Sequence, residues 1–285
     1  MPERINKAVE LLAQKQPIYY TGAETRGYEA GREGARTWAD YIAYEMEHGP
    51  FDITALHEFM RGLADGGPTA SGHRTPAVIP TLPVLGADEA SFKAGAWMVS
   101  QALAAGVHGI LLCHAESPAA VAAFVESTRY PFASPDGRRG SGGQATAAAI
   151  WGVTTQEYLA KADPWPLNPD GELLLGLKIE NKRALANVER TLAVPGIAFA
   201  EWGPGDMGMS LGFPDAHDPP YPPEMQAARA RVLAACQANG VAFLEMVSPD
   251  NVVEQIAAGV MVGAGRQAQA AAEIGRKHTG RSMPW

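Results

Sequence analysis

"ELLLGLKIENKRALANVERTLA" (residues 172–193) contains, in one stretch, the pattern that sets the architecture of this 285-residue chain. Its first part, residues 172–180, is a near-continuous apolar run. Such a run is typical of a parallel strand that is covered on both faces. Its second part, residues 181–193, has the spacing of an amphipathic helix. The stretch therefore predicts a strand followed directly by a helix.

The same alternation recurs along the chain. We predict eight strands, at residues 17–23, 40–46, 76–82, 109–115, 172–180, 196–203, 242–247 and 259–264. Helical patterns lie between them, at residues 89–106, 117–128, 181–193, 222–240 and 249–259. Several helices open at a cap and a proline, as at Ser117-Pro118, and close on glycine. This order predicts an α/β fold, a single (β/α)8 TIM barrel over residues 1–285.

Residues 129–171 interrupt the alternation of strands and helices, because they carry many glycines and prolines between two predicted strands. A connection of this length is usually functional or disordered. Its aromatic residues and helical patches predict an ordered excursion from the barrel.

Composition excludes several classes of function. The formal net charge is −8 and no basic run is present, so we expect neither nucleic acid nor a membrane surface as a partner. No apolar stretch reaches the roughly 18 residues of a membrane-spanning helix, and residues 1–16 lack the apolar core of a signal peptide. Cys113 and Cys236 have no metal-ligand spacing, so we expect reduced core cysteines in a cytoplasmic protein.

In barrels of this type, the chemistry lies at the carboxyl ends of the strands. The polar side chains predicted at these ends are Glu45, Glu47, His48, Lys178, Glu180, Glu201 and Asp206. Because residues two apart on a strand share a face, Lys178 and Glu180 point the same way.

Two carboxylates from neighbouring strand ends suit a hard divalent cation such as Mg²⁺, which leaves coordination positions for substrate oxygens. A 2-oxo acid could fill two of them, and the metal would stabilise an enolate as a Lewis acid. The glycine-rich turn at residues 203–205 would present backbone N–H groups to the substrate carboxylate. Other interpretations stay open: the carboxylates could be helix caps, Lys178 could be an ion-pair partner of Glu180, and His114 could be a core histidine.

Four segments together resemble the HpcH/HpaI aldolase family of class II, metal-dependent pyruvate aldolases. "YEMEHGPFD" (44–52) is similar to the family's DxEHxPxD-like segment, and "ESTRYPFASPDGRRG" (126–140) to ATRYPPxGxRG. "LKIENKRAL" (177–185) is similar to VQIETxxAL, and "FAEWGPGDMGMSLG" (199–212) to xxFIGPxDLSxxxG. The resemblance covers most of the chain, and the combination is specific although single fragments are not.

The resemblance implies a barrel of the phosphoenolpyruvate/pyruvate-domain type and assigns roles to residues. Glu180 and Asp206 would hold Mg²⁺, Mn²⁺ or Co²⁺, and His48, beside Glu47, would be the general base. Gly203, Pro204 and Gly205 would bind the substrate carboxylate. It also implies a homo-oligomer, a trimer or hexamer, for which residues 129–171 and the tail "RKHTGRSMPW" (276–285) with Trp285 offer apolar surface.

The chain also departs from the family pattern. The third strand carries Ile79, Pro80 and Thr81 where the family has an arginine that polarises the keto oxygen. Lys178 stands where the family has glutamine, and Glu45 where it has aspartate. We infer that Lys178 supplies part of the lost positive charge.

These observations predict a metal-dependent carbon–carbon lyase that cleaves or forms a 4-hydroxy-2-oxo acid from pyruvate and an aldehyde through a metal-bound enolate. One alternative is a Schiff-base aldolase that uses Lys178, and another is a non-catalytic barrel that binds a metabolite. The loop aromatics Tyr130, Trp151, Tyr158 and Trp165 would favour an apolar or aromatic aldehyde, and a role in aromatic compound catabolism, if they face the substrate.

Overall fold

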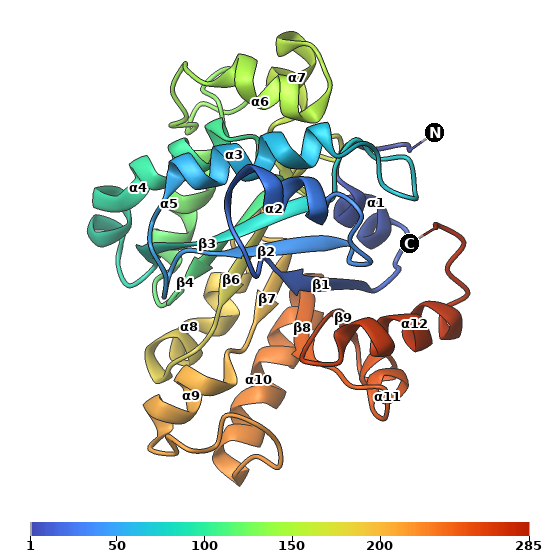
Figure 1. Cartoon of the computed structure of the whole chain (residues 1–285). Helices are drawn as coiled ribbons and strands as arrows, with labels where there is room; N and C mark the ends of the chain where they lie inside the picture. The colour runs from blue at the N-terminus through green and yellow to red at the C-terminus, as the bar shows by residue number, and fades with distance from the viewer. Residues whose placement is uncertain (1, 285) are drawn as a thin grey trace.

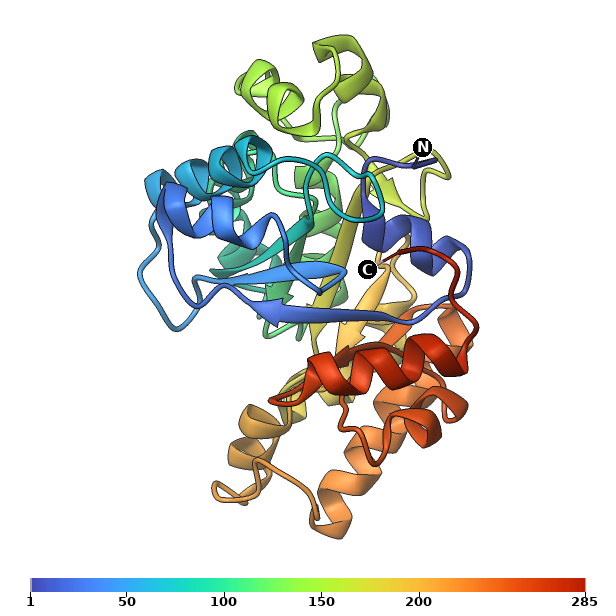
Figure 2. The ribbon, with the colours of Figure 1, turned by 45° about the vertical axis from the view of Figure 1, so that its right-hand side comes forward.

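The computed structural model describes residues 2–284 and shows a closed barrel of eight parallel strands with helices around it (Figures 1 and 2). The barrel strands are β1 (Ile18–Gly22), β2 (Tyr41–Glu45), β3 (Ala77–Leu85), β4 (Gly109–Cys113), β6 (Leu173–Lys178), β7 (Phe199–Glu201), β8 (Ala242–Met246) and β9 (Val260–Ala264). Pairing of β4 with β6 and of β1 with β9 closes the ring. The predicted (β/α)8 barrel is confirmed, and each of the eight predicted strands overlaps one of these.

The helices alternate with the barrel strands along the chain, and α1 precedes β1. They are α1 (Lys7–Ala13), α2 (Gly27–Gly34), α3 (Ile53–Asp65), α4 (Glu89–Ala104), α5 (Pro118–Thr128), α6 (Gln144–Trp151), α7 (Thr155–Lys161), α8 (Lys182–Leu192), α9 (Pro204–Leu211), α10 (Pro223–Asn239), α11 (Val252–Ala257) and α12 (Ala268–His278). The five predicted helices correspond to α4, α5, α8, α10 and α11. Side-chain caps fix the first turns of α5 and α8. Ser117 accepts from Ala120 N at the start of α5, and Asn181 accepts from Arg183 N and Ala184 N at the start of α8.

Apolar side chains fill the interior of the barrel. Ile18, Tyr41, Ile79, Leu174, Phe199, Leu244 and Val262 form one buried cluster with Ala8, Val9, Leu11 and Leu12 of α1. The N-terminal helix thus packs onto the barrel core, and a second cluster lies between the strands and the outer helices. Because the interior is packed, polar chemistry is confined to the carboxyl ends of the strands.

Residues 129–171 contain α6, α7 and the short strand β5 (Pro164–Trp165), which pairs with β6 and was not among the predicted strands. Helices α6 and α7 lie together above α3 in Figure 1, and α6 contacts α3 and α4. Tyr130, Trp151 and Tyr158 are buried, and Trp151 Nε1 donates to the carbonyl of Gly106 at 2.9 Å. These three rings therefore serve packing in this structure.

Three remaining sequence predictions concern the chain as a whole. Cys113 and Cys236 are both free and buried, as expected of core cysteines. Within residues 2–284, no helix is both long enough and apolar enough to cross a membrane. Trp285, which was expected to contribute apolar surface, lies outside the described residues.

Candidate active site

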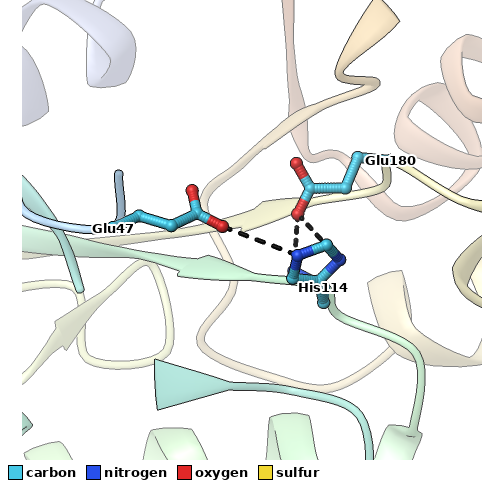
Figure 3. A group of neighbouring side chains, drawn as sticks. All are labelled: Glu47, His114 and Glu180. Atoms are coloured by element: carbon cyan, nitrogen blue, oxygen red, sulfur yellow. Dashed lines mark hydrogen bonds and ion pairs between the residues drawn. The ribbon is translucent and has the colours of Figure 1, made fainter. Parts of the chain in front are cut away.

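Three segments that are far apart in the sequence bring Glu47, His114 and Glu180 together. Glu47 lies just beyond β2, His114 directly follows β4, and Glu180 lies just beyond β6. One ligand atom from each lies within 4.8 Å of the other two. Figure 3 shows the three side chains pointing toward one another. Since all three follow the carboxyl ends of barrel strands, this is where barrel enzymes place their chemistry.

Glu180 is the most deeply buried member of this triad, with a side chain that is 1% exposed. Burial raises the pKa of Glu180, although Lys178 and the backbone N–H of His114 act in the opposite direction. That N–H donates to Glu180 Oε1 at 2.7 Å. The Glu180 carboxylate is thus held in place, and positive charge compensates its negative charge only in part.

Gly203 places the glycine-rich turn against Glu180. A Cβ atom on Gly203 would lie 2.6 Å from Glu180 Cβ and 3.3 Å from Oε2, and the φ of Gly203 is +48°. Only glycine fits both the contact and the backbone conformation without strain. Pro204 and Gly205 then begin α9, so the predicted substrate-binding turn and the predicted ligand Glu180 are neighbours.

Asp206, the second predicted metal ligand, lies in the first turn of α9 and is partly buried. It is three residues beyond Gly203 but is not a member of the triad. Among residues 2–284, no side chain forms an ion pair with Asp206.

Lys178 connects two of the predicted residues. Its Nζ donates to Glu47 Oε2 at 2.6 Å and lies 3.9 Å from Glu180 Oε2. Burial lowers the pKa of Lys178, but the neighbouring Cys113 and the carboxyl groups of Glu201, Glu180 and Glu47 outweigh burial, so this pKa is raised. Burial would likewise raise the pKa of Glu47, but the hydrogen bond from Lys178 holds it below the ordinary value. The two side chains therefore form an ion pair.

His48, the predicted base, lies at the rim of this group. Its side chain is 65% exposed and Nε2 is 3.4 Å from Glu47 Oε2. Glu45 holds the turn that carries it: Oε1 accepts from His48 N at 3.0 Å, and Oε2 accepts from Thr81 Oγ1 at 2.6 Å. Glu45 and Thr81 thus position the loop between β2 and α3.

His114 is the residue that sequence reasoning left without a role. Its Nδ1 is 3.4 Å from Glu180 Oε1 and its Nε2 is 3.6 Å from Glu47 Oε1. Its φ of +48° is unusual for a residue with a side chain. Its position at the carboxyl end of β4 was the available signal, since the same rule selected Glu47 and Glu180.

A small cavity of about 180 Å³ is lined by Lys178, the ion-pair partner of Glu47. Its lining includes Tyr20, Tyr41, Ile79, Thr81, Lys178 and Glu201. Ile79 presents an apolar side chain where the family pattern would have arginine. Glu201 stands beside Lys178 in the register of β6 and β7, and burial raises the pKa of Glu201 to about 7.

A wider cleft of about 570 Å³ opens where β8 and β9 end, lined by residues that include Tyr221, Arg229, Glu245, Ser248 and Arg266. None of the triad residues lines it, and Arg229 is already paired with Glu245. The triad contains two carboxylates that could hold a cation, Glu47 and Glu180, so we place the candidate chemistry there.

The residues present fit a divalent cation. Glu45, Glu47 and Glu180 interact electrostatically with Glu201, and Lys178 interacts with Glu47, Glu180 and Glu201, so carboxyl groups outnumber ammonium groups in this region. Buried carboxylates of this kind are stabilised by a bound metal ion. Oxygen and nitrogen atoms at the observed separations are chemically suitable donors.

The fold and this site define an enzyme of the TIM-barrel class with an acidic centre at the strand ends. Residues 33–266 match the HpcH/HpaI aldolase/citrate lyase family, and the chain belongs to that family.

Curated relatives include a hydroxypyruvate/pyruvate aldolase from Paraburkholderia phytofirmans, 30% identical over 218 residues, which covers 76% of this chain and 74% of the relative. A 2-keto-3-deoxy-L-rhamnonate aldolase from Escherichia coli O9:H4 is also 30% identical, over 77% of this chain and 71% of its own. A solved structure of an HpcH/HpaI aldolase/citrate lyase family protein from Burkholderia cenocepacia J2315 aligns with a TM-score of 0.74 at 25% identity, covering 96% of this chain and 97% of that one. The named relatives are aldolases, which supports an enzymatic role.

Proposed function

We propose that the protein is a divalent-metal-dependent aldolase that cleaves or forms a 4-hydroxy-2-oxo acid from pyruvate and an aldehyde. The observation that carries this proposal is the contact between Glu180 and Gly203. It joins a buried carboxylate to a glycine-rich helix start, which are the two parts needed to hold a cation and an anionic substrate side by side.

Glu180 and Asp206 would hold the metal, Mg²⁺, Mn²⁺ or Co²⁺. When bound, the metal supplies Lewis-acid polarisation of the keto oxygen of the 2-oxo acid. Burial of Glu180 keeps this carboxylate away from bulk water, which strengthens its interaction with any cation.

The turn formed by Gly203, Pro204 and Gly205 would bind the substrate carboxylate. The first N–H groups of a helix have no partner within the helix and attract anions. Pro204 has no N–H, so Gly205 is the first residue of α9 that can donate. A Cβ atom on Gly205 would lie 2.9 Å from the ring of His217, so glycine leaves room for that ring beside the turn.

His48 would accept the proton of the C4 hydroxyl group during cleavage and return it during synthesis. Its exposed ring can reach a substrate above the barrel, and Glu47 lies within ion-pairing distance of Nε2. Glu47 is thus placed to interact with the imidazolium that forms when His48 accepts the proton. Lys178 holds Glu47 in position through its 2.6 Å hydrogen bond.

Lys178 would stabilise the negative charge that develops on the enolate oxygen. It is charged, because its pKa is raised, and it ends β6 two residues before Glu180. A raised pKa disfavours the Schiff-base alternative, since an imine-forming lysine must lose its proton to become a nucleophile.

A non-catalytic metabolite-binding barrel is the second candidate, and Ile79 is the observation that favours it. An apolar side chain there removes a donor that the family pattern aims at the keto oxygen. Loss of one such donor typically lowers the rate by about 10²–10³.

An aldehyde screen with pyruvate as donor tests the two candidates. We expect carbon–carbon bond formation with at least one aldehyde in the presence of Mg²⁺, Mn²⁺ or Co²⁺, and loss of product with EDTA. Pyruvate and metal binding without turnover across a broad panel would favour the binding barrel.

We further propose that the protein forms a homo-oligomer, a trimer or hexamer, in the cytoplasm. Trp97, Phe132 and Met209 are apolar side chains that are more than half exposed, and such surface favours association. A monomer by light scattering at micromolar concentration would contradict this.

A further inference from the structure

We propose that His114 is a nitrogen ligand of the metal centre, so that the site selects Mn²⁺, Co²⁺ or Zn²⁺ over Mg²⁺. This inference rests on the proposed function and names the class of metal that the site takes. Three independent features of His114 support it: its position, its backbone and its hydrogen bonds.

The position of His114 allows one cation to reach it together with Glu180. Nδ1 and Glu180 Oε1 are 3.4 Å apart, and a donor atom from each of Glu47, His114 and Glu180 lies within 4.8 Å of the others. The three residues come from different strand ends, so the barrel itself, and not local sequence, brings them together.

The backbone of His114 is held in a costly conformation. Its φ is +48°, and it is one of two residues other than glycine with positive φ among residues 2–284. Such strain persists where the surrounding structure fixes it, and it is concentrated at functional sites. Here the conformation directs the N–H of His114 onto Glu180 Oε1 and brings the ring beside the same carboxylate.

Hydrogen bonds determine which ring nitrogen is free to bind a metal. Asn181 Oδ1 accepts from the N–H groups of Arg183 and Ala184, and its Nδ2 donates to Glu116 Oε1 at 2.9 Å. The amide orientation is therefore fixed, and the same Nδ2 donates to His114 Nδ1 at 3.2 Å.

Nδ1 must accordingly carry a lone pair, which places the proton of the neutral ring on Nε2. That Nε2–H faces Glu47 Oε1 at 3.6 Å. A histidine whose second nitrogen faces a carboxylate is the usual arrangement of a metal ligand. The structure thus assigns Nδ1 as the donor atom to the metal. In the absence of a cation, Asn181 Nδ2 donates a hydrogen bond to the lone pair of Nδ1.

A nitrogen donor changes the metal preference. Mg²⁺ is a hard cation that prefers oxygen ligands and keeps its waters, whereas imidazole suits the transition metals and zinc. Glu180 and Asp206 alone would form an all-oxygen site that accepts Mg²⁺. The addition of His114 Nδ1 favours Co²⁺ and Zn²⁺ most strongly, and Mn²⁺ to a smaller degree.

The test is pulsed electron paramagnetic resonance of the Mn²⁺-loaded, full-length protein, read as electron spin echo envelope modulation from ¹⁴N. The variants are His114→Asn and, as the matched control, His48→Gln. Asparagine tolerates positive φ, so His114→Asn removes the ring with little backbone cost. Calorimetric titrations with Co²⁺ and Mg²⁺ accompany the spectra.

We expect directly coordinated nitrogen in the wild type and in His48→Gln, and none in His114→Asn. Affinity for Co²⁺ should fall at least about tenfold in His114→Asn, with a much smaller change for Mg²⁺. If His114→Asn does not fold, His114→Gly replaces it at the same φ.

Mn²⁺ bound without nitrogen coupling in the wild type would overturn the assignment and leave the proposed aldolase intact. Coupling that disappears in His48→Gln and persists in His114→Asn would overturn it in favour of His48. A wild-type protein that binds none of these metals would overturn both the assignment and the proposed function.

Discussion

Lys178 Nζ donates a hydrogen bond to Glu47 Oε2 at 2.6 Å, which ties the end of β6 to the loop after β2. The two residues are 131 positions apart in the sequence. The pair holds Glu47 ionised beside His48 and His114, and it holds the ammonium of Lys178 within 3.9 Å of Glu180. A single ion pair therefore links the proposed base, the proposed metal ligand and the cation that we propose as a substitute for the missing arginine.

Substitution of Lys178 should separate its two possible roles. If it stabilises the enolate, Lys178→Met should slow exchange of the C3 protons of pyruvate by about a hundredfold, with a much smaller effect on pyruvate binding. That pattern marks an interaction made mainly in the transition state. Deuterium exchange followed by NMR measures it, with the exposed Lys182→Met as the matched control.

Lys178→Gln completes this test, because it restores the residue of the family pattern. Exchange in both Lys178 variants within about twofold of wild type, a difference of roughly 0.4 kcal/mol, would show that Lys178 serves only as an ion-pair partner.

Borohydride should not trap an adduct between pyruvate and the protein. Cys113 and the carboxyl groups around Lys178 raise its pKa, so little of the neutral amine needed for imine formation is present. Mass spectrometry after reduction in the presence of pyruvate checks this. A mass increase located at Lys178 and lost in Lys178→Met would establish the Schiff-base mechanism instead.

Gly203→Ala should weaken metal binding more than it weakens folding. A Cβ atom there would lie 2.6 Å from Glu180 Cβ, so Glu180 must move. The positive φ adds about 1 kcal/mol of backbone strain. Gly212→Ala is the matched control, because Gly212 also has positive φ but no atom lies within 4 Å of the position that its Cβ would occupy.

Thermal unfolding and calorimetric metal titration of the two glycine variants provide the measurements. We expect the two variants to lose similar amounts of stability. We expect only Gly203→Ala to lose metal affinity. Equal metal affinities in the two variants would contradict the placement of the turn against Glu180.

Glu201 should give the metal-free protein a distinctive pH dependence. Burial raises its pKa from 4.5 to about 7, so the folded state binds this proton more tightly than the unfolded chain does. The resulting stabilisation is fully present below pH 4.5 and is lost as the pH rises through 7. Glu201→Gln should therefore gain stability relative to wild type between pH 5 and pH 8.

Thermal melts in EDTA over this pH range measure the difference between the two proteins. The difference reports the removal of the Glu201 carboxyl group, because the buried histidines titrate in both proteins. The exposed Glu224→Gln is the control and should follow wild type. A constant difference between wild type and Glu201→Gln from pH 5 to pH 8 would be inconsistent with a raised pKa.

The barrel was predictable because each of its strands is a short apolar run followed by a helix, so local pattern and topology agree. The run at residues 172–180 is the strongest case, since it becomes β6 and ends at Lys178. Strand β5 was not predictable, because two residues that pair only with β6 leave no periodic signal.

The site was only partly accessible to sequence reasoning. Glu47, Lys178 and Glu180 were found because strand ends in a barrel share one face. His114 was not, because its role depends on a positive φ and on Asn181, 67 residues further along the chain. The pKa of Glu201 depends on charges contributed by β2, β6 and the loops beyond them, which no local window contains.

The exchange of the C3 protons of pyruvate with deuterium, before and after removal of metal, is the decisive experiment for the proposed reaction. Enolate formation is its first chemical step and needs no knowledge of the aldehyde. We expect exchange in the metal-loaded protein, no exchange above background after EDTA treatment, and recovery when Mn²⁺ or Co²⁺ is added. Glu180→Gln and Asp206→Asn should each lower the metal-dependent rate by several orders of magnitude, since each removes a ligand. Full exchange in a chelated, metal-free sample, or undiminished exchange in both variants, would contradict a metal-dependent aldolase.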